Sequence, residues 1–292
     1  MKFFQAILMG IMQGLTEFLP VSSSGHLALI KAIFGIESDT GILYDVLLHV
    51  ATLISICIVF YKDILRLVLE FVGMCRDVFA NLSIFAKSLS GAKDTKYFKI
   101  IDSPYRKFVC LLIVSTIPTG LIGVFMGDVV EYASTSLLIT GICLICTGVI
   151  LFISDFLPEK GKRLKEANYG DAFSVGIAQG IATLPGLSRS GTTISACLLC
   201  GFDRKFAAKY SFIMSMPAIL GALILEISDI AKETITAGDV GTYIIGMLIA
   251  GVIGYVALNI TMKLVVSKYF RYFAFYCMGV GVISVIVFLI KL

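Results

Sequence analysis

Six stretches of the chain stay mostly apolar for about 18 residues or more, the length that a helix needs to cross a bilayer. They lie at 43–61, 108–126, 136–154, 210–227, 242–260 and 272–290. Two further apolar stretches, 3–12 and 27–34, are too short to cross and flank a polar segment. The pattern predicts an all-α integral membrane protein with six transmembrane helices.

Two polar segments interrupt this pattern, and they resemble each other. Residues 13–26 read Q-G-L-T-E-F-L-P-V-S-S-S-G-H, and residues 179–193 read Q-G-I-A-T-L-P-G-L-S-R-S-G-T-T. Both begin Gln-Gly, pass through Leu-Pro and reach Ser-x-Ser-Gly. Irregular backbone at membrane depth is tolerated only where protein or a water-filled cavity surrounds it. We therefore predict two re-entrant helix hairpins, at 1–35 and 171–202.

The charges between the apolar stretches predict the orientation of the chain. The segments 87–107, 160–165 and 263–271 are basic, whereas 128–131 and 229–239 are acidic. Basic loops face the cytoplasm, so the first hairpin enters from the outer face and the second from the inner face. The prediction is a single membrane domain, 1–292, made of two inverted repeats, 1–154 and 155–292. Such repeats place a polar site near the bilayer midplane.

Composition agrees with this topology. The chain of 292 residues is 58% hydrophobic and 15% charged, with a mean hydropathy of +0.95. Soluble domains are about 45–50% apolar and about 25% charged. The net charge of +4 is small and concentrated in loops, which favours membrane topology and no nucleic-acid partner. The polar region that follows residue 62 is expected to begin with an amphipathic helix.

The polar segments carry residues suited to phosphoryl chemistry. Burying Glu17 and Arg189 costs about 2.5–3.5 kcal/mol each, so such residues pair, line a wet cavity or act on a ligand. Gln13 and Glu17 share a helix face. Each serine-rich turn opens a helix, whose N-terminus attracts anions, and a guanidinium binds phosphate oxygens bidentately. His26 could then act as a nucleophile or a proton shuttle.

Plainer roles stand beside these. The hairpin serines could serve only close packing, Gln179 could be a hydrogen-bonding helix residue, and the two buried charges could form a structural ion pair. Asp45 and His49, near the start of the first span, are expected to be solvated rim residues.

At these residues the sequence resembles the undecaprenyl-diphosphate phosphatases of the bacitracin-resistance (BacA) type. The first signature of that family, Glu/Gln-x-x-x-Glu followed by F-L-P-V-S-S-[ST]-G-H, is matched from Gln13 to His26. The second, P-G-x-S-R-S-x-x-T, is matched from Pro185 to Thr193. The resemblance covers essentially the whole chain. Many members carry Glu at the position of Gln13, so here only Glu17 is charged in this motif.

The resemblance implies that a polyprenyl diphosphate is hydrolysed: undecaprenyl diphosphate gives undecaprenyl phosphate and inorganic phosphate, which recycles the lipid carrier for peptidoglycan. It also implies a bacterial cytoplasmic (inner) membrane, a site reached from the outer, periplasmic face, and a divalent cation, Mg²⁺ or Ca²⁺. The oligomeric state stays open, with a homodimer among the options. Carried over by position, the expected residues are catalytic Glu17, Ser23, His26 and Arg189; substrate-binding Ser22, Gly25, Gly186, Ser188, Ser190 and Thr193; and metal-binding Glu17 with Gln13.

The residues leave the route of attack open. Arg189 is expected to clamp the diphosphate while a cation near Glu17 offsets its charge. His26 or Ser23 could attack the terminal phosphorus, or His26 could activate water. A lipid-phosphate flippase is the rival function, since inverted repeats with broken helices are typical of transporters. A histidine beside Glu17 and Ser23 favours an enzyme, because binding alone needs no titratable nucleophile.

Overall fold

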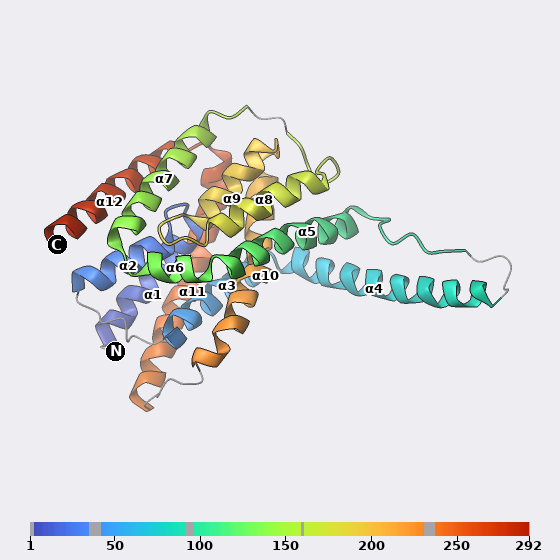
Figure 1. The fold of residues 1–292 in the computed structure, drawn as a ribbon, viewed down its shortest axis with the longest axis horizontal. Coiled ribbons are helices and arrows are strands. Elements are labelled where there is room, and N and C mark those ends of the chain that lie inside the picture. The colour runs from blue at the N-terminus through green and yellow to red at the C-terminus, as the bar shows by residue number, and fades with distance from the viewer. Residues whose placement is uncertain (1–2, 35–41, 91–95, 159–160, 231–236, 292) are drawn as a thin grey trace.

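The structure, a computed structural model, describes residues 3–34, 42–90, 96–158, 161–230 and 237–291. The chain folds into helices that cross one another in a bundle, from which one long helix extends (Figure 1). In chain order the helices are α1 (Phe3–Phe18), α2 (Ser23–Phe34), α3 (Ile42–Val59), α4 (Tyr61–Leu89), α5 (Pro104–Phe125), α6 (Gly127–Ser134), α7 (Leu137–Asp155), α8 (Tyr169–Ile181), α9 (Arg189–Leu199), α10 (Arg204–Ile230), α11 (Ala237–Val266) and α12 (Phe270–Lys291).

The apolar stretches predicted as spans all fall on helices. Among the described residues, α5, α7, α10, α11 and α12 are long and apolar enough to cross a membrane. α3 becomes a sixth span only when it is counted together with α4, from which it is bent by 89°. The prediction of an all-helical protein is confirmed, with five or six candidate membrane spans among the described residues, whereas the exact number of six stays a prediction. The re-entrant arrangement of the two helix pairs α1–α2 and α8–α9 stays a prediction.

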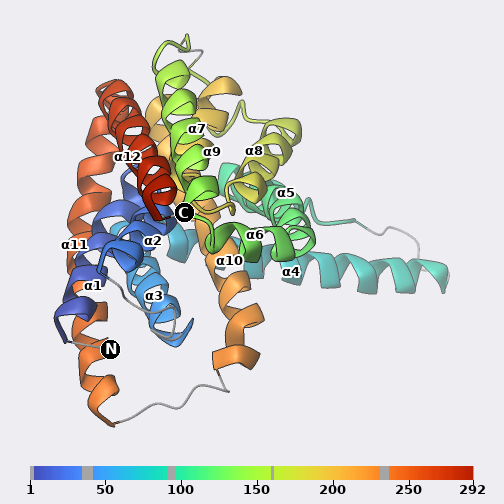
Figure 2. The same cartoon turned by 60° about the vertical axis from the view of Figure 1, so that its left-hand side comes forward.

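Each predicted hairpin packs against the opposite half of the chain. α1 lies along α11, and α8 lies along α5 (Figures 1 and 2). α5 is the second span of the first predicted repeat, and α11 is the second span of the other repeat. Each hairpin therefore packs against the second span of the opposite half of the chain. The third spans, α7 and α12, pack against each other. This pairing is what two repeats related by a two-fold axis would give, although the membrane orientation remains a prediction.

Glycines allow the exchanged helices to approach closely. A Cβ on Gly14 of α1 would lie 2.6 Å from a carbonyl oxygen of α11. A Cβ on Gly176 of α8 would lie 2.2 Å from the carbonyl oxygen of Ser115 on α5. Both glycines belong to the same short sequence, G-I-x-Q-G, at 10–14 and at 176–180. The duplicated segment thus provides the same small-residue contact in both hairpins.

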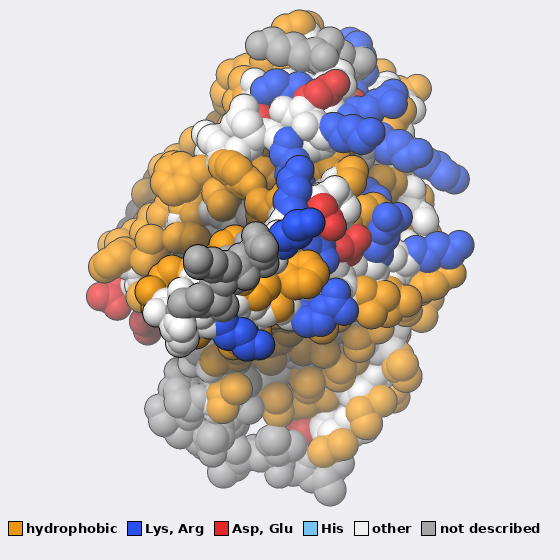
Figure 3. Space-filling model, turned by 90° about the vertical axis from the view of Figure 1, so that its right-hand side faces the viewer, with side chains coloured by type: hydrophobic (Ala, Val, Ile, Leu, Met, Phe, Trp, Pro, Cys, Tyr) orange, Lys and Arg blue, Asp and Glu red, His pale blue; other side chains and the backbone are white. Residues whose placement is uncertain are grey.

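Ion pairs tie α4 to the start of α5. The Arg106 guanidinium lies 3.1 Å from the Glu70 carboxylate and 2.7 Å from that of Asp77. Both carboxylates belong to α4, which confirms the helix expected after residue 62. Lysines and arginines gather on this side of the molecule (Figure 3), the side that the charge pattern predicts to face the cytoplasm.

One predicted loop is wrong. The acidic segment 128–131 belongs to helix α6, whose eight residues are too few to show a periodic pattern in the sequence. Asp128 lies in its first turn, where a carboxylate stabilises the helix dipole, and Ala133 is buried. Residues 1–2 and 35 of the first predicted hairpin, and 91–95, 159–160 and 231–236 of the charged loops, lie outside the described residues.

We expect Gly176→Ala to lower the melting temperature of the protein in detergent. Its Cβ would force α8 away from α5, and overpacking costs about 1–3 kcal/mol. Gly120→Ala on α5 is the matched control, because no described atom lies within 4 Å of its Cβ position. Equal melting temperatures for the two variants would contradict the close packing of α8 on α5.

Candidate active site

Each of the two serine-rich turns caps the start of a helix. Ser22 Oγ accepts a hydrogen bond from the Gly25 N–H at 3.2 Å, where α2 begins. Ser188 Oγ accepts one from the Gly191 N–H at 3.1 Å, where α9 begins. In both turns the capping hydroxyl lies 3.3 Å from the hydroxyl of the second serine of the motif. The duplicated Ser-x-Ser-Gly sequence therefore makes the same capping hydrogen bond twice. The backbone differs between the two capping residues, with φ at +71° for Ser22 and −77° for Ser188.

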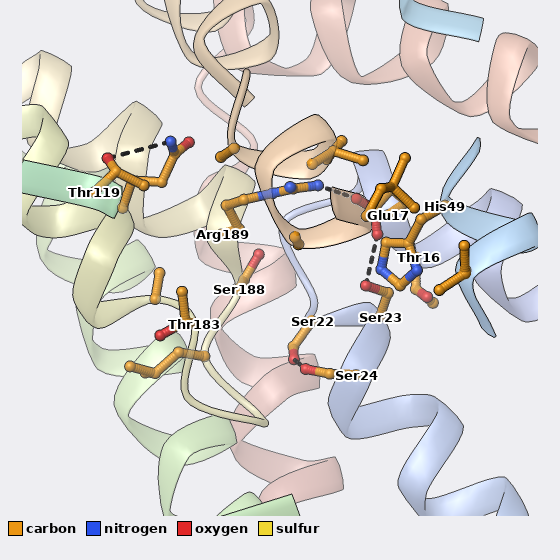
Figure 4. Close-up of a pocket in the computed structure, with 18 of the residues that line it drawn as sticks. Thr16, Glu17, Ser22, Ser23, Ser24, His49, Thr119, Thr183, Ser188 and Arg189 are labelled. Atoms are coloured by element: carbon orange, nitrogen blue, oxygen red, sulfur yellow. Dashed lines mark hydrogen bonds and ion pairs between the residues drawn. The ribbon is translucent and has the colours of Figure 1, made fainter. Parts of the chain in front are cut away.

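Glu17 joins the two turns. The residue that follows each capping serine, Ser23 in one turn and Arg189 in the other, points to this carboxylate (Figure 4). Ser23 Oγ donates to Oε2 at 2.7 Å, and Gln13 Nε2 donates to the same oxygen at 3.0 Å. Arg189 forms an ion pair with Oε1. The Glu17 side chain is only 3% exposed, so Arg189 provides the positive charge that its burial requires.

A cavity of about 260 Å³ opens beside this ion pair. Both turns and parts of α1, α2, α3, α5, α8, α9 and α10 surround it. The residues predicted for the site that line this cavity are Glu17, Ser22, Ser23, Ser188 and Arg189. Hydroxyls, a guanidinium and two helix N-termini thus face one space, which suits a phosphate group.

Four predicted substrate-binding residues lie outside this lining and shape the turns. Gly25 and Gly186 lie where the turns touch: a Cβ on Gly25 would be 3.2 Å from the Cα of Gly186. Gly186 also has φ +93°, which favours glycine. Ser190 lines a much smaller space behind Arg189. Thr193 Oγ1 donates to the carbonyl oxygen of Arg189 at 2.7 Å. These contacts support a positioning role for all four residues.

His26, the predicted catalytic histidine, also lies outside the lining of the cavity. Its Nδ1 is 2.8 Å from the carbonyl oxygen of Ser22, and its Nε2 is 2.8 Å from the hydroxyl of Tyr276. The imidazole stacks on the Tyr276 ring with centroids 5.5 Å apart. Both ring nitrogens have partners inside the protein, so the catalytic role of His26 remains a prediction from its place in the motif.

Several polar residues that line the cavity were missed from the sequence, His49 and Thr183 among them. His49 was expected at a solvated rim, but it lines the cavity beside Glu17 (Figure 4). Thr183 also lines it, at the position of the second polar segment that corresponds to Glu17 in the first. Aligning the two segments from Gln13 and Gln179 would have identified Thr183. No sequence signal could place His49, because its neighbours come from other helices.

Asp45, the other expected rim residue, makes a contact that the sequence did not suggest. Its carboxylate forms an ion pair with Lys31 at 2.7 Å and is 35% exposed. This bridge links α2 to α3 and therefore holds α3 against the first hairpin.

The oxygen atoms around Glu17 fit a hard cation only together with a ligand. Among the described residues, no group of three or more His, Cys, Asp or Glu side chains could hold a metal. Gln13 Oε1 is buried and has no hydrogen-bond partner in the described part of the chain. Mg²⁺ is usually bound by one or two carboxylates together with substrate phosphates. Glu17 and Gln13 thus fit a cation that phosphate oxygens help to hold.

The fold and the site define an integral membrane protein with a polar cleft where two helix pairs meet. The chain belongs to the bacitracin resistance protein BacA family, whose model matches residues 6–283. It is similar to proteins named undecaprenyl-diphosphatase. That of Treponema denticola is 40% identical over 281 residues, 96% of each chain. That of Alkaliphilus metalliredigens is 38% identical over 291 residues, 98% of each chain. That of Methanosphaera stadtmanae is 37% identical over 281 residues, 96% of each chain.

We expect the protein in detergent to bind inorganic pyrophosphate. Arg189→Lys should weaken this binding about tenfold or more, because an ammonium group lacks the planar, two-pronged donor geometry of a guanidinium. Isothermal titration calorimetry measures both affinities. Arg271→Lys is the control, since Arg271 pairs with Asp155 at 3.0 Å outside the cavity. Equal affinities for all three proteins would remove Arg189 as the anion anchor.

Proposed function

We propose that the protein hydrolyses undecaprenyl diphosphate to undecaprenyl phosphate and inorganic phosphate, and so recycles the lipid carrier for cell-wall synthesis. The observation that carries this is the similarity to proteins named undecaprenyl-diphosphatase over 96–98% of the chain. The geometry agrees, because a guanidinium, hydroxyls and helix N-termini converge on one cavity in a membrane protein. The relatives are named for hydrolysis, so the flippase alternative is not favoured.

Arg189 is the proposed phosphate anchor. Its guanidinium is held by Glu17 and lies at the N-terminus of α9, where backbone N–H groups also favour an anion. A diphosphate would share or take over the contact that Arg189 makes with Glu17. Apolar lining residues, Val46 and Leu187 among them, leave room for the first part of a lipid tail.

Ser23 and water are the candidate nucleophiles in the cavity. Ser23 Oγ is oriented by its hydrogen bond to Glu17, which places the hydroxyl at the edge of the space for phosphate. Attack on the terminal phosphorus by Ser23 would give a phosphoserine that water then hydrolyses. Attack by water would give phosphate in one step.

The cavity would be reached from the outer, periplasmic face of a bacterial cytoplasmic membrane. His49 lies in the first half of α3, whereas Thr119 and Glu226 lie near the ends of α5 and α10. The charge pattern predicts that all three of these helix ends face outward. The reciprocal packing of α1 on α11 and of α8 on α5 supports two inverted repeats, 1–154 and 155–292, with the cleft between them.

Glu17 and Gln13 Oε1 would hold a divalent cation, Mg²⁺ or Ca²⁺, together with the diphosphate. When bound, the cation would offset the negative charge of the phosphate groups. Glu17 would then bind both the cation and Arg189, which explains why its carboxylate lies between the two hairpins.

Purified protein should release phosphate from undecaprenyl diphosphate in detergent, and Arg189→Ala should lower kcat/KM by about 100-fold or more, the usual effect of removing a group that stabilises developing charge. A colorimetric phosphate assay measures both. Arg271→Ala, outside the cavity, serves as the control. A flippase would release no phosphate, and full activity in Arg189→Ala would disprove the proposed anchor.

EDTA should abolish phosphate release. Gln13→Glu should lower the Mg²⁺ concentration that gives half-maximal activity by about tenfold, because a second carboxylate raises the affinity for a hard cation. Activity measured against free Mg²⁺ concentration tests both expectations. Gln179→Glu, at the corresponding position of the second hairpin, is the matched control. Undiminished activity in EDTA would rule out a required exchangeable cation.

A further inference from the structure

The chain has two histidines, and their ring nitrogens are used differently. In both, Nδ1 lies near a backbone carbonyl oxygen four residues earlier: 2.8 Å for His26 and 2.9 Å for His49. A carbonyl oxygen can only accept, so Nδ1 carries the proton in both hydrogen bonds. In the neutral ring Nε2 is then the nitrogen that can take up a proton.

Nε2 of His26 already has a hydrogen-bond partner. It accepts a hydrogen bond from the Tyr276 hydroxyl at 2.8 Å, and the ring is 5% exposed and stacked on Tyr276. A proton taken up there would displace the Tyr276 hydroxyl hydrogen, at a site that does not line the cavity.

Nε2 of His49 has no hydrogen-bond partner among the described residues, and the side chain lines the cavity. Figure 4 shows the imidazole beside Ser23 and Glu17. The neutral His49 ring therefore presents Nε2 as a proton acceptor, held in one tautomer, next to the candidate nucleophiles.

Glu17 is poorly placed to take the proton instead. Its Oε1 is paired with Arg189, and its Oε2 accepts hydrogen bonds from Ser23 and Gln13. A carboxylate with these partners is stabilised as an anion, so it anchors the two turns.

We infer that His49, and not His26, is the proton acceptor of the hydrolysis; this inference rests on the proposed phosphatase function. His49 Nε2 takes a proton from the attacking water as the water oxygen forms a bond to the terminal phosphorus. The bond from this phosphorus to the bridging oxygen breaks, and its electron pair leaves with the lipid monophosphate.

The charges that face His49 come from several helices. Glu17 of α1, Arg189 of α9 and Glu226 of α10 line the same cavity. On its own helix, Asp45 is paired with Lys31 of α2. α11 packs on α3 but contributes none of the described lining residues. Because these charges also influence the pH dependence of kcat, the variants that are compared must leave all of them in place.

The test is the pH dependence of kcat for His49→Gln, which keeps a hydrogen-bonding side chain but cannot titrate. We expect kcat to fall about 10²- to 10⁴-fold and KM to change less than about threefold. The wild-type enzyme should lose activity as the pH falls, and His49→Gln should not show this acid-side decrease. Tyr276→Phe is the matched control. It frees Nε2 of His26 and should leave the acid limb in place, whereas a shifted limb would indicate His26.

Chemical rescue provides the second measurement. His49→Ala should regain part of its kcat when imidazole is added, because the deleted side chain opens into the cavity, and its melting temperature in detergent shows whether it is folded. Wild-type kcat or an unchanged acid limb in His49→Gln would overturn the inference while the phosphatase function stands. Absence of phosphate release by the wild-type protein would instead disprove the proposed function.

Discussion

The ion pair between Glu17 and Arg189 is the contact on which the rest of the structure depends. Each hairpin brings one charge to a place where a single charge would be costly. Neither half of the chain can therefore bury its hairpin alone, and the two turns must meet. The glycines at the meeting point, Gly25 and Gly186, allow the turns to come that close. Charge and backbone packing impose the same arrangement.

The exchange of hairpins between the halves gives this ion pair a rigid support. α1 is held by α11 and α8 by α5, so each turn is positioned by the opposite half of the chain. Small residues at these contacts fix the helix separation more strictly than long side chains would. A cleft formed in this way requires both halves, although its residues lie in two short segments of sequence.

Periodicity and motif were enough to predict the helices, the two broken pairs and the family. These features depend on residues close together in the chain. The position of a side chain relative to another helix depends on residues far apart in the chain, which is why His49 was assigned to a rim although it lines the cavity. His26 follows its capping serine by four residues, so one helical turn brings its ring back to the Ser22 carbonyl. The sequence did not predict α6, because a helix of eight residues is too short to show a periodic pattern of apolar positions.

The two helix starts share a capping hydrogen bond but carry different side chains. Where one turn has Ser23, the other has Arg189, and where the first segment has Glu17, the second has Thr183. Two helix pairs with similar sequences thus enclose a cleft whose two sides are unequal. A ligand with two unlike ends meets a different set of groups in each orientation, so the duplicated frame can select which end is presented for reaction before any bond is broken.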